Sequence, residues 1–277
     1  MIKETVSLKV DYEKAGLDPE GCEPVLDCYA NTVTEEIGRK NRRAVLVLPG
    51  GGYDFLSERE ADPIAFRFLG AGFAAFVLRY SVYRKKWPTD LLECAAAVKY
   101  IRENAEKYDL DPDKVVVCGF SAGGHLAASV SNFWNTELVT DALSCKAEDV
   151  KVNGTILGYP VITSDPAFTH EGSIQNLIGE EKSEELRELV SMEKRVSENT
   201  PQTFIWHCAD DGLVSVMNSL RYMSALSENK IPFEAHIYEW GGHGLANADE
   251  TTSTNEWHIQ PVAAKWMQSA IEWVKRL

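Results

Sequence analysis

The sequence lacks three features that would direct it to particular partners: a C-x-x-C pair, an apolar run of transmembrane length and an excess of basic residues. Six scattered cysteines argue against a zinc site or a disulfide framework and favour reduced core thiols. The net charge of −14 argues against nucleic acid and anionic membrane surfaces as partners. Residues 1–5 lack the apolar segment of a secretory signal peptide. We therefore expect a cytoplasmic protein without membrane, nucleic-acid or metal partners.

Apolar strand patterns alternate with helix patterns along most of the chain, which predicts a mostly parallel, doubly wound α/β sheet. Neither a repeat nor a linker divides the chain, so we expect a single domain over residues 1–277. Residues 111–113 are expected to break the chain before a central strand. An antiparallel region with strands at 5–10 and 26–32 precedes strands at 44–48, 73–78, 115–118, 154–157, 203–207 and 233–238. Helices are expected at 62–70, from about 89, through 216–223 and from about 261.

One long polar segment, residues 161–200, lies between two of these strands. It is rich in charge and carries one short amphipathic helix through Leu186, Leu189 and Val190. Long connections inside compact domains are usually functional. We expect this segment to form a small cap over the carboxyl edge of the sheet.

The central strand leads directly into Gly119-Phe120-Ser121-Ala122-Gly123 and then into a helix of small residues. A G-x-S-x-G motif between a strand and a helix is typical of a nucleophile elbow. The two glycines are needed because the serine turn is strained and leaves no room for side chains beside it. The motif alone also occurs by chance, but the flanking strand and helix make Ser121 the candidate nucleophile.

A second glycine cluster, Gly50-Gly51-Gly52, follows the strand at 44–48. Glycines at this place let the backbone approach a ligand and direct N–H groups toward it. Taken alone, the cluster would be a plain flexible turn. Together with the serine motif it predicts half of an oxyanion hole.

A serine hydroxyl needs an adjacent base, which a carboxylate orients. His243 is favoured as the base because it lies in a glycine loop after the last predicted strand. His125, one helical turn after Ser121, is expected to be a packed helix residue. Asp210 and Asp211 both follow the strand at 203–207, and the spacing does not choose between them. The remaining histidines, which lie in strands, in the expected cap and before the last helix, are His170, His207, His236 and His258.

From residue 44 onward the chain resembles α/β-hydrolase serine esterases, close to the acetyl esterase and acetyl-xylan-esterase-like group related to the hormone-sensitive-lipase family. The resemblance rests on Pro-Gly-Gly-Gly-Tyr at 49–53, Gly-Phe-Ser-Ala-Gly-Gly-His-Leu-Ala at 119–127, Gly-Tyr-Pro at 158–160, Trp-His-Cys-Ala-Asp-Asp at 206–211 and Gly-Gly-His-Gly at 241–244. It implies an α/β-hydrolase fold with about eight strands and helices on both faces of the sheet.

The resemblance also implies roles for individual residues. The acid loop of such enzymes often reads D-x-x-V-P; residues 211–215 fit except for Ser215, which points to Asp211, with Asp210 second. The oxyanion hole would consist of the N–H groups of Gly51, Gly52 and Ala122. Pro49 stands where the lipase-type H-G-G-G motif has histidine, and the lipase family's own acid-loop motif is absent. Both departures favour short-acyl or small carbohydrate-ester hydrolases.

We therefore expect a serine esterase that acts through an acyl-enzyme on small esters, including acetylated sugars or xylo-oligosaccharides, without a metal or organic cofactor. The alternatives are a general short-chain carboxylesterase or lipase-like enzyme and a non-catalytic hydrolase-fold binding protein; no triad residue is missing, which disfavours the last. Three aromatic residues near strand ends, Tyr53, Phe120 and Tyr159, and a fourth from its own loop, Trp87, are expected to narrow the substrate pocket. The alcohol part of the substrate and the oligomeric state stay open.

Overall fold

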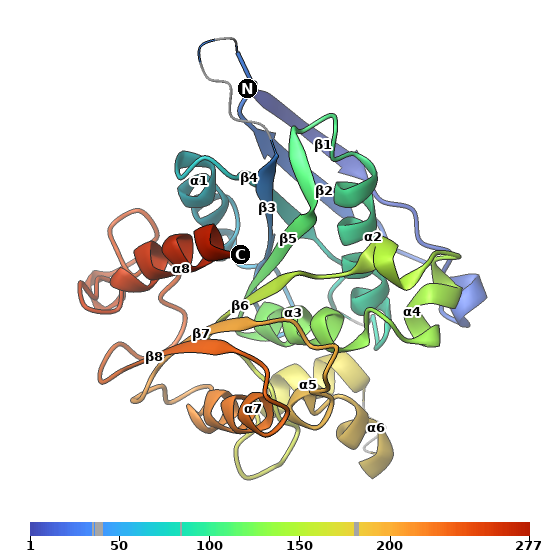
Figure 1. Cartoon of the computed structure of the whole chain (residues 1–277). Coiled ribbons are helices and arrows are strands. Elements are labelled where there is room, and N and C mark those ends of the chain that lie inside the picture. The colour runs from blue at the N-terminus through green and yellow to red at the C-terminus, as the bar shows by residue number, and fades with distance from the viewer. Residues whose placement is uncertain (35, 37–40, 84, 180–182) are drawn as a thin grey trace.

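A computed structural model of the protein describes residues 1–34, 36, 41–83, 85–179 and 183–277. In these ranges eight strands form one sheet in the order β1-β2-β4-β3-β5-β6-β7-β8 (Figure 1). The strands are β1 (Ile2–Ser7), β2 (Val25–Ala30), β3 (Arg42–Leu48), β4 (Ala74–Arg79), β5 (Leu110–Phe120), β6 (Gly154–Gly158), β7 (Thr203–Cys208) and β8 (Phe233–Tyr238).

Pairing in the sheet changes from antiparallel to parallel at β4. β1 with β2 and β2 with β4 pair antiparallel, whereas every pair from β4 to β8 is parallel. The middle strands are continuously apolar because both faces of a parallel sheet are covered by helices. In β3, Leu46 packs into the core on one face and Val45 and Val47 into the core on the other. The expected doubly wound α/β sheet is confirmed.

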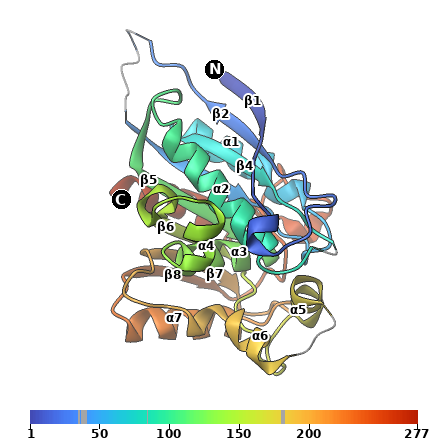
Figure 2. The ribbon, with the colours of Figure 1, turned by 90° about the vertical axis from the view of Figure 1, so that its right-hand side faces the viewer.

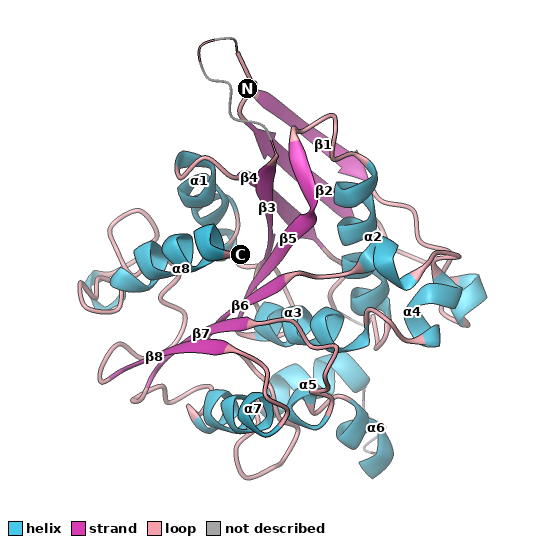
Figure 3. Ribbon diagram, in the orientation of Figure 1, coloured by secondary structure: helices cyan, strands magenta, loops and turns pink. Residues whose placement is uncertain are grey.

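Helices cover both faces of the sheet, as Figure 3 shows in cyan beside the magenta strands. α1 and α8 contribute to the core on one face, and α2, α3 and α7 to the core on the other. The helices are α1 (Asp62–Gly70), α2 (Thr89–Glu103), α3 (Ala122–Phe133), α4 (Glu137–Ala142), α5 (Glu171–Ile178), α6 (Glu184–Leu189), α7 (Met217–Glu228) and α8 (Lys265–Arg276). None of the helices in the described part of the chain has the length and apolar character needed to cross a membrane.

Three predicted boundaries differ from the structure by three or more residues. β1 covers residues 2–7 rather than 5–10, because Pro24, beside the strand end, has no N–H with which to continue the ladder. β5 begins at Leu110; the expected break at 111–113 is an interruption of pairing with β3 inside that strand. The last helix begins at Lys265, after a turn closed by the Ala264 N–H and the carbonyl of Gln260.

The expected cap segment, residues 161–200, contains two α-helices rather than one. Figure 2 shows α5 and α6 together at the lower end of the molecule. The sequence did not predict α5, because Gly172 and Ser173 in its first half are weak helix formers. Its apolar residues Ile174, Leu177 and Ile178 are stabilised by burial in the main core. Residues 180–182 of this segment lie outside the described residues.

A buried carboxyl group lies in the first turn of α2. Asp90 is 3% exposed, and burial, with the nearby Glu93 carboxylate, raises its pKa to about 7. The pKa of Asp90 is higher in the folded state than in the unfolded chain. Its contribution to the free energy of unfolding is therefore complete below about pH 4 and is lost as the pH rises through 7. We therefore expect Asp90→Asn to stabilise the protein more at pH 8 than at pH 5, by a difference on the order of 2–3 kcal/mol.

Chemical denaturation at the two pH values measures this difference. Asp141→Asn, at an exposed position in α4, is the matched control and should change stability by less than about 0.5 kcal/mol at both. An equal effect of Asp90→Asn at pH 5 and pH 8 would contradict the prediction.

Candidate active site

Ser121 lies at the sharp turn between β5 and α3. Its φ of 52° and ψ of −118° are rarely adopted by residues other than glycine. A Cβ on Gly119 would come within 2.0 Å of the Gly123 carbonyl oxygen, and a Cβ on Gly123 within 2.2 Å of the Leu48 oxygen. The two glycines of the motif are therefore required by steric contact.

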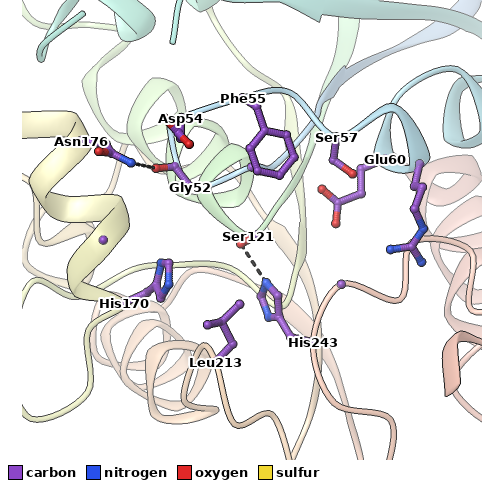
Figure 4. A pocket seen from close by; sticks show the side chains of 14 residues that line it. Gly52, Asp54, Phe55, Ser57, Glu60, Ser121, His170, Asn176, Leu213 and His243 are labelled. Atoms are coloured by element: carbon purple, nitrogen blue, oxygen red, sulfur yellow. Dashed lines mark hydrogen bonds between the residues drawn. The ribbon is translucent and has the colours of Figure 1, made fainter. Parts of the chain in front are cut away.

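Three loops bring Ser121, His243 and Asp211 into one hydrogen-bonded line (Figure 4). Ser121 Oγ lies 2.9 Å from His243 Nε2, and His243 Nδ1 lies 2.7 Å from Asp211 Oδ2. The carboxylate accepts from Nδ1–H, which leaves Nε2 as an acceptor for the serine hydroxyl. The loops follow β5, β7 and β8, whose carboxyl ends meet at one edge of the parallel sheet.

The Asp211 carboxylate receives four hydrogen bonds. Oδ1 accepts from the backbone N–H groups of Leu213 and Val214, each at 2.9 Å, and Oδ2 accepts from both His243 and His207. Burial alone would raise the pKa of Asp211, but the bonds from His207, His243 and Val214 together hold it well below its ordinary value. The group is therefore an anion, able to stabilise a positive charge on His243.

Asp210 is not part of this line. Its Oδ1 accepts from the backbone N–H of Gly242 at 2.9 Å and so supports the loop that carries His243. Of the two neighbouring aspartates that the spacing left open, the structure places Asp211, not Asp210, beside His243.

His207 is a partner of Asp211 that the sequence did not reveal. Its Nε2–H lies 3.1 Å from Asp211 Oδ2 and 3.0 Å from the Val214 oxygen, and its Nδ1 accepts from the Ser219 hydroxyl at 2.7 Å. The side chain is fully buried. The available signal was that a histidine within a buried strand needs polar partners. The position of His207 alone did not identify those partners.

His125 is the packed helix residue that the sequence predicts. Its Nδ1 accepts from the Tyr53 hydroxyl at 2.7 Å, and its Nε2–H donates to the Val190 carbonyl at 2.8 Å. Burial lowers its pKa to about 4, so the ring is neutral at pH 7. It therefore connects the loop after β3 to the chain after α6 and takes no part in the line of Ser121, His243 and Asp211.

The glycine loop after β3 is held by its carbonyl groups. The Tyr80 hydroxyl donates to the Pro49 oxygen at 2.6 Å, the Phe55 N–H to the Gly51 oxygen at 3.2 Å and Asn176 Nδ2 to the Gly52 oxygen at 2.8 Å. Within the described ranges, no hydrogen bond uses the N–H groups of Gly51 or Gly52.

Both glycines have positive φ, 128° and 67°, and a Cβ on Gly51 would come within 2.0 Å of the Phe55 oxygen. Ala122 is the first residue of α3, where an N–H has no acceptor within the helix. The N–H groups of Gly51, Gly52 and Ala122 are thus available to a ligand beside Ser121.

A pocket of about 390 Å³ opens above Ser121 and His243. Figure 4 shows the loop after β3 on one side of it and the cap residues His170 and Asn176 on another. Polar side chains such as Asp54, Ser57 and Asn176 lie among apolar surface on its walls. The lining residues are Gly51, Gly52, Asp54, Phe55, Ser57, Arg59, Glu60, Ser121, His170, Gly172, Asn176, Leu213, His243 and Gly244.

The four aromatic residues expected in the pocket are all absent from its lining, so that prediction is wrong. They lie in the core because large apolar rings gain most from full burial against the sheet. The Tyr53 ring packs against Tyr80, Trp87 against Phe133, and Phe120 against Tyr159 and Trp266. Two residues that the sequence did not indicate form the apolar part of the pocket instead, the exposed side chains of Phe55 and Leu213.

His170 comes from the cap and is not part of the hydrogen-bonded line. Its Nδ1 lies 2.8 Å from Ser173 Oγ. Burial and the neighbouring His243 lower its pKa. Within the described ranges, no group of three or more His, Cys, Asp or Glu side chains could hold a metal ion.

Comparison with known proteins links this geometry to a family. The BD-FAE family model matches residues 26–226, which include Ser121 and Asp211 but not His243. The chain is 38% identical over 216 residues to endo-1,4-beta-xylanase B of Butyrivibrio fibrisolvens, covering 76% of this chain and 33% of that protein. It is 31% identical over 208 residues to the acetylxylan esterase of Xylanibacter ruminicola, covering 73% of this chain and 41% of that protein. The chain thus spans 33% and 41% of these curated relatives.

Solved structures resemble the chain over nearly its whole length. An acetyl ester-xyloside bifunctional hydrolase from Caldicellulosiruptor lactoaceticus is 32% identical, with a TM-score of 0.84, and the match covers 99% of this chain and 96% of that one. The carboxylesterase Cest-2923 from Lactobacillus plantarum is 24% identical, with a TM-score of 0.83. The match covers 100% of this chain and 98% of that one, and it supports the fold alone.

Proposed function

Since this chain belongs to the BD-FAE family of α/β-hydrolase esterases, we propose that it hydrolyses carboxylic esters of short acyl groups, chiefly acetyl, through an acyl-enzyme on Ser121. One observation carries the proposal. The Ser121–His243–Asp211 line opens onto the same pocket as Gly51 and Gly52, whose N–H groups are unpaired within the described ranges.

The geometry supports a two-step acyl transfer. His243 Nε2 takes the hydroxyl proton as Ser121 Oγ attacks the ester carbonyl, and the N–H groups of Gly51, Gly52 and Ala122 bind the resulting oxyanion. Asp211 holds the Nδ1–H tautomer and stabilises the imidazolium. His243 then protonates the leaving alcohol, and a water molecule, deprotonated by the same nitrogen, hydrolyses the acyl-enzyme.

The alcohol part is proposed to be an acetylated sugar or xylo-oligosaccharide. Two relatives bear names that refer to acetylxylan and to acetyl ester and xyloside substrates. Three polar side chains that line the pocket, those of Asp54, Ser57 and Asn176, offer hydrogen-bond partners for sugar hydroxyls. Acetate release from a panel of acetylated xylo-oligosaccharides tests this part of the proposal.

The cap segment, residues 161–200, is proposed to limit access to the site. Three of its residues, His170, Gly172 and Asn176, line the pocket, and the Asn176 amide donates to the Gly52 carbonyl. The cap therefore forms one wall of the pocket and holds the glycine loop at the same time.

The preference for short acyl groups can be measured with p-nitrophenyl esters. The pocket volume of about 390 Å³ lies at the small end for ligand sites and must hold both acyl and alcohol parts. An octanoyl chain has six more methylene groups than acetyl, and overpacking by a few methylenes costs about 1–3 kcal/mol. We expect kcat/KM to fall about ten- to a hundredfold from acetate to octanoate, with butyrate between them. A flat or rising series would indicate a lipase-like enzyme.

A further inference from the structure

Glu60 is a buried acid in the active-site wall that the acyl-transfer scheme does not use. It ends a short 3₁₀ helix (Glu58–Glu60), is 4% exposed and lines the pocket. Figure 4 shows its carboxylate directed toward the side where Ser121 lies. Burial of a carboxylate costs free energy unless the group is hydrogen-bonded. The hydrogen-bond partners of Glu60 therefore show which parts of the structure it connects.

Both partners of the Glu60 carboxylate belong to active-site loops. Oε2 accepts from the backbone N–H of Gly50 at 2.8 Å, directly before the two proposed oxyanion glycines. Oε1 accepts from the Tyr159 hydroxyl at 2.7 Å. The Tyr159 hydroxyl oxygen in turn accepts from the N–H of Ala246 at 2.9 Å. Ala246 lies three residues after His243. One carboxylate therefore connects the oxyanion loop, the end of β6 and the histidine loop.

The connection leaves little freedom around the reacting groups. The Tyr159 ring packs edge-on against His243, with ring centroids 5.0 Å apart. A Cβ on Gly50 would lie 2.7 Å from Glu60 Oε2 and 3.0 Å from Ser121 Cβ, so the carboxylate and the nucleophile flank the same glycine. Tyr159 and Ala246 have positive φ, 35° and 53°. Such strained residues persist only where surrounding contacts determine them, and here the Tyr159 hydroxyl supplies that contact.

We propose that Glu60 is a positioning residue that fixes the oxyanion N–H groups relative to the His243 imidazole. This inference rests on the proposed esterase function. Both elements that Glu60 holds act most strongly in the transition state, when the oxyanion and the imidazolium are present. Loss of the connection therefore lowers kcat and leaves KM nearly unchanged.

Two substitutions break the connection at different points. Glu60→Gln offers one acceptor oxygen where the carboxylate offers two, so either the Gly50 N–H or the Tyr159 O–H loses its acceptor. Tyr159→Phe keeps the ring against His243 but removes the hydroxyl between Glu60 and Ala246. Each is expected to lower kcat for p-nitrophenyl acetate about 10- to 100-fold per titrated active site, with KM changed less than about threefold. Because the two share a hydrogen bond, the double variant should lose less than the product of the single losses.

A transition-state probe separates positioning from simple stability. Methylboronic acid adds to an active serine as a tetrahedral anion, so its inhibition constant should rise by the same factor as kcat falls. Burst titration with p-nitrophenyl acetate counts folded active sites, and a merely structural role would lower that count without changing kcat per site. Glu58→Gln is the matched control: Glu58 lies in the same short helix, its side chain is exposed and pairs with Arg79, and its kinetics should stay unchanged.

The outcomes distinguish this inference from the esterase proposal. If the wild type hydrolyses the ester but Glu60→Gln and Tyr159→Phe keep wild-type kcat and boronate affinity, the positioning role is overturned. If both variants lose only titratable sites, the role is structural, which also overturns the inference. If the wild type neither hydrolyses acetate esters nor is acylated at Ser121, the proposed function itself has failed.

Discussion

Ser121→Ala is expected to lower kcat for p-nitrophenyl acetate by about 10⁵- to 10⁶-fold, because the oxygen that forms the acyl-enzyme is absent. Folding should be unaffected, since only one hydroxyl group is removed and its hydrogen bond is to His243. Steady-state kinetics on purified protein measure the loss, and the melting temperature checks the fold.

Ser57→Ala is the control for this experiment. Ser57 lines the same pocket, and the bond it donates to the glycine loop comes from its backbone N–H, which the substitution keeps. It should retain activity within about tenfold. Hydrolysis by Ser121→Ala at more than one thousandth of the wild-type rate would show that another group carries the reaction.

Asp211→Asn is expected to lower kcat by about 10⁴-fold. An asparagine can present its amide N–H₂ to His243 Nδ1, which favours the tautomer that has its proton on Nε2 and cannot accept the Ser121 proton. The lost negative charge would also leave the imidazolium without its counter-charge. The kinetic comparison with the wild type, at matched protein concentration and a pH near neutrality, measures the effect.

The neighbouring residue supplies a matched control. Asp210→Asn keeps an Oδ1 acceptor for the Gly242 N–H and lies outside the Ser121–His243 line. Its kcat should fall by less than about tenfold. If Asp210→Asn caused the large loss and Asp211→Asn did not, the acid would be Asp210, and the hydrogen-bond geometry would not describe the working enzyme.

The sequence by itself determined the parts of this protein that depend on neighbours along the chain. The elbow at Ser121 follows from local sterics, since Gly119 and Gly123 have no room for a Cβ. Strands with continuous apolar runs predict a parallel sheet that helices cover on both faces. The carboxyl ends of its strands must meet at one edge. By that rule the sequence alone predicts that His243 and the aspartate loop lie near Ser121.

Tertiary structure decided which of two adjacent aspartates faces His243 and which aromatic rings face the pocket. Asp210 and Asp211 are chemically alike, and only the fold of their loop directs one to the imidazole and the other to Gly242. The sequence shows that Tyr53 and Phe120 are large rings near strand ends, but not whether they face the core or the pocket. Both are buried in the core, because burial of a large apolar ring stabilises the fold.

The least predictable contacts join residues that are far apart in the chain. Glu60 and Tyr159 are separated by 99 positions, and His207 contacts Asp211 from within a buried strand whose pattern indicates only burial. A sequence pattern reports how each residue partitions between water and the core. The pairing of buried polar groups depends on distances and directions that exist only after the sheet has brought separate loops together, because hydrogen bonds require both.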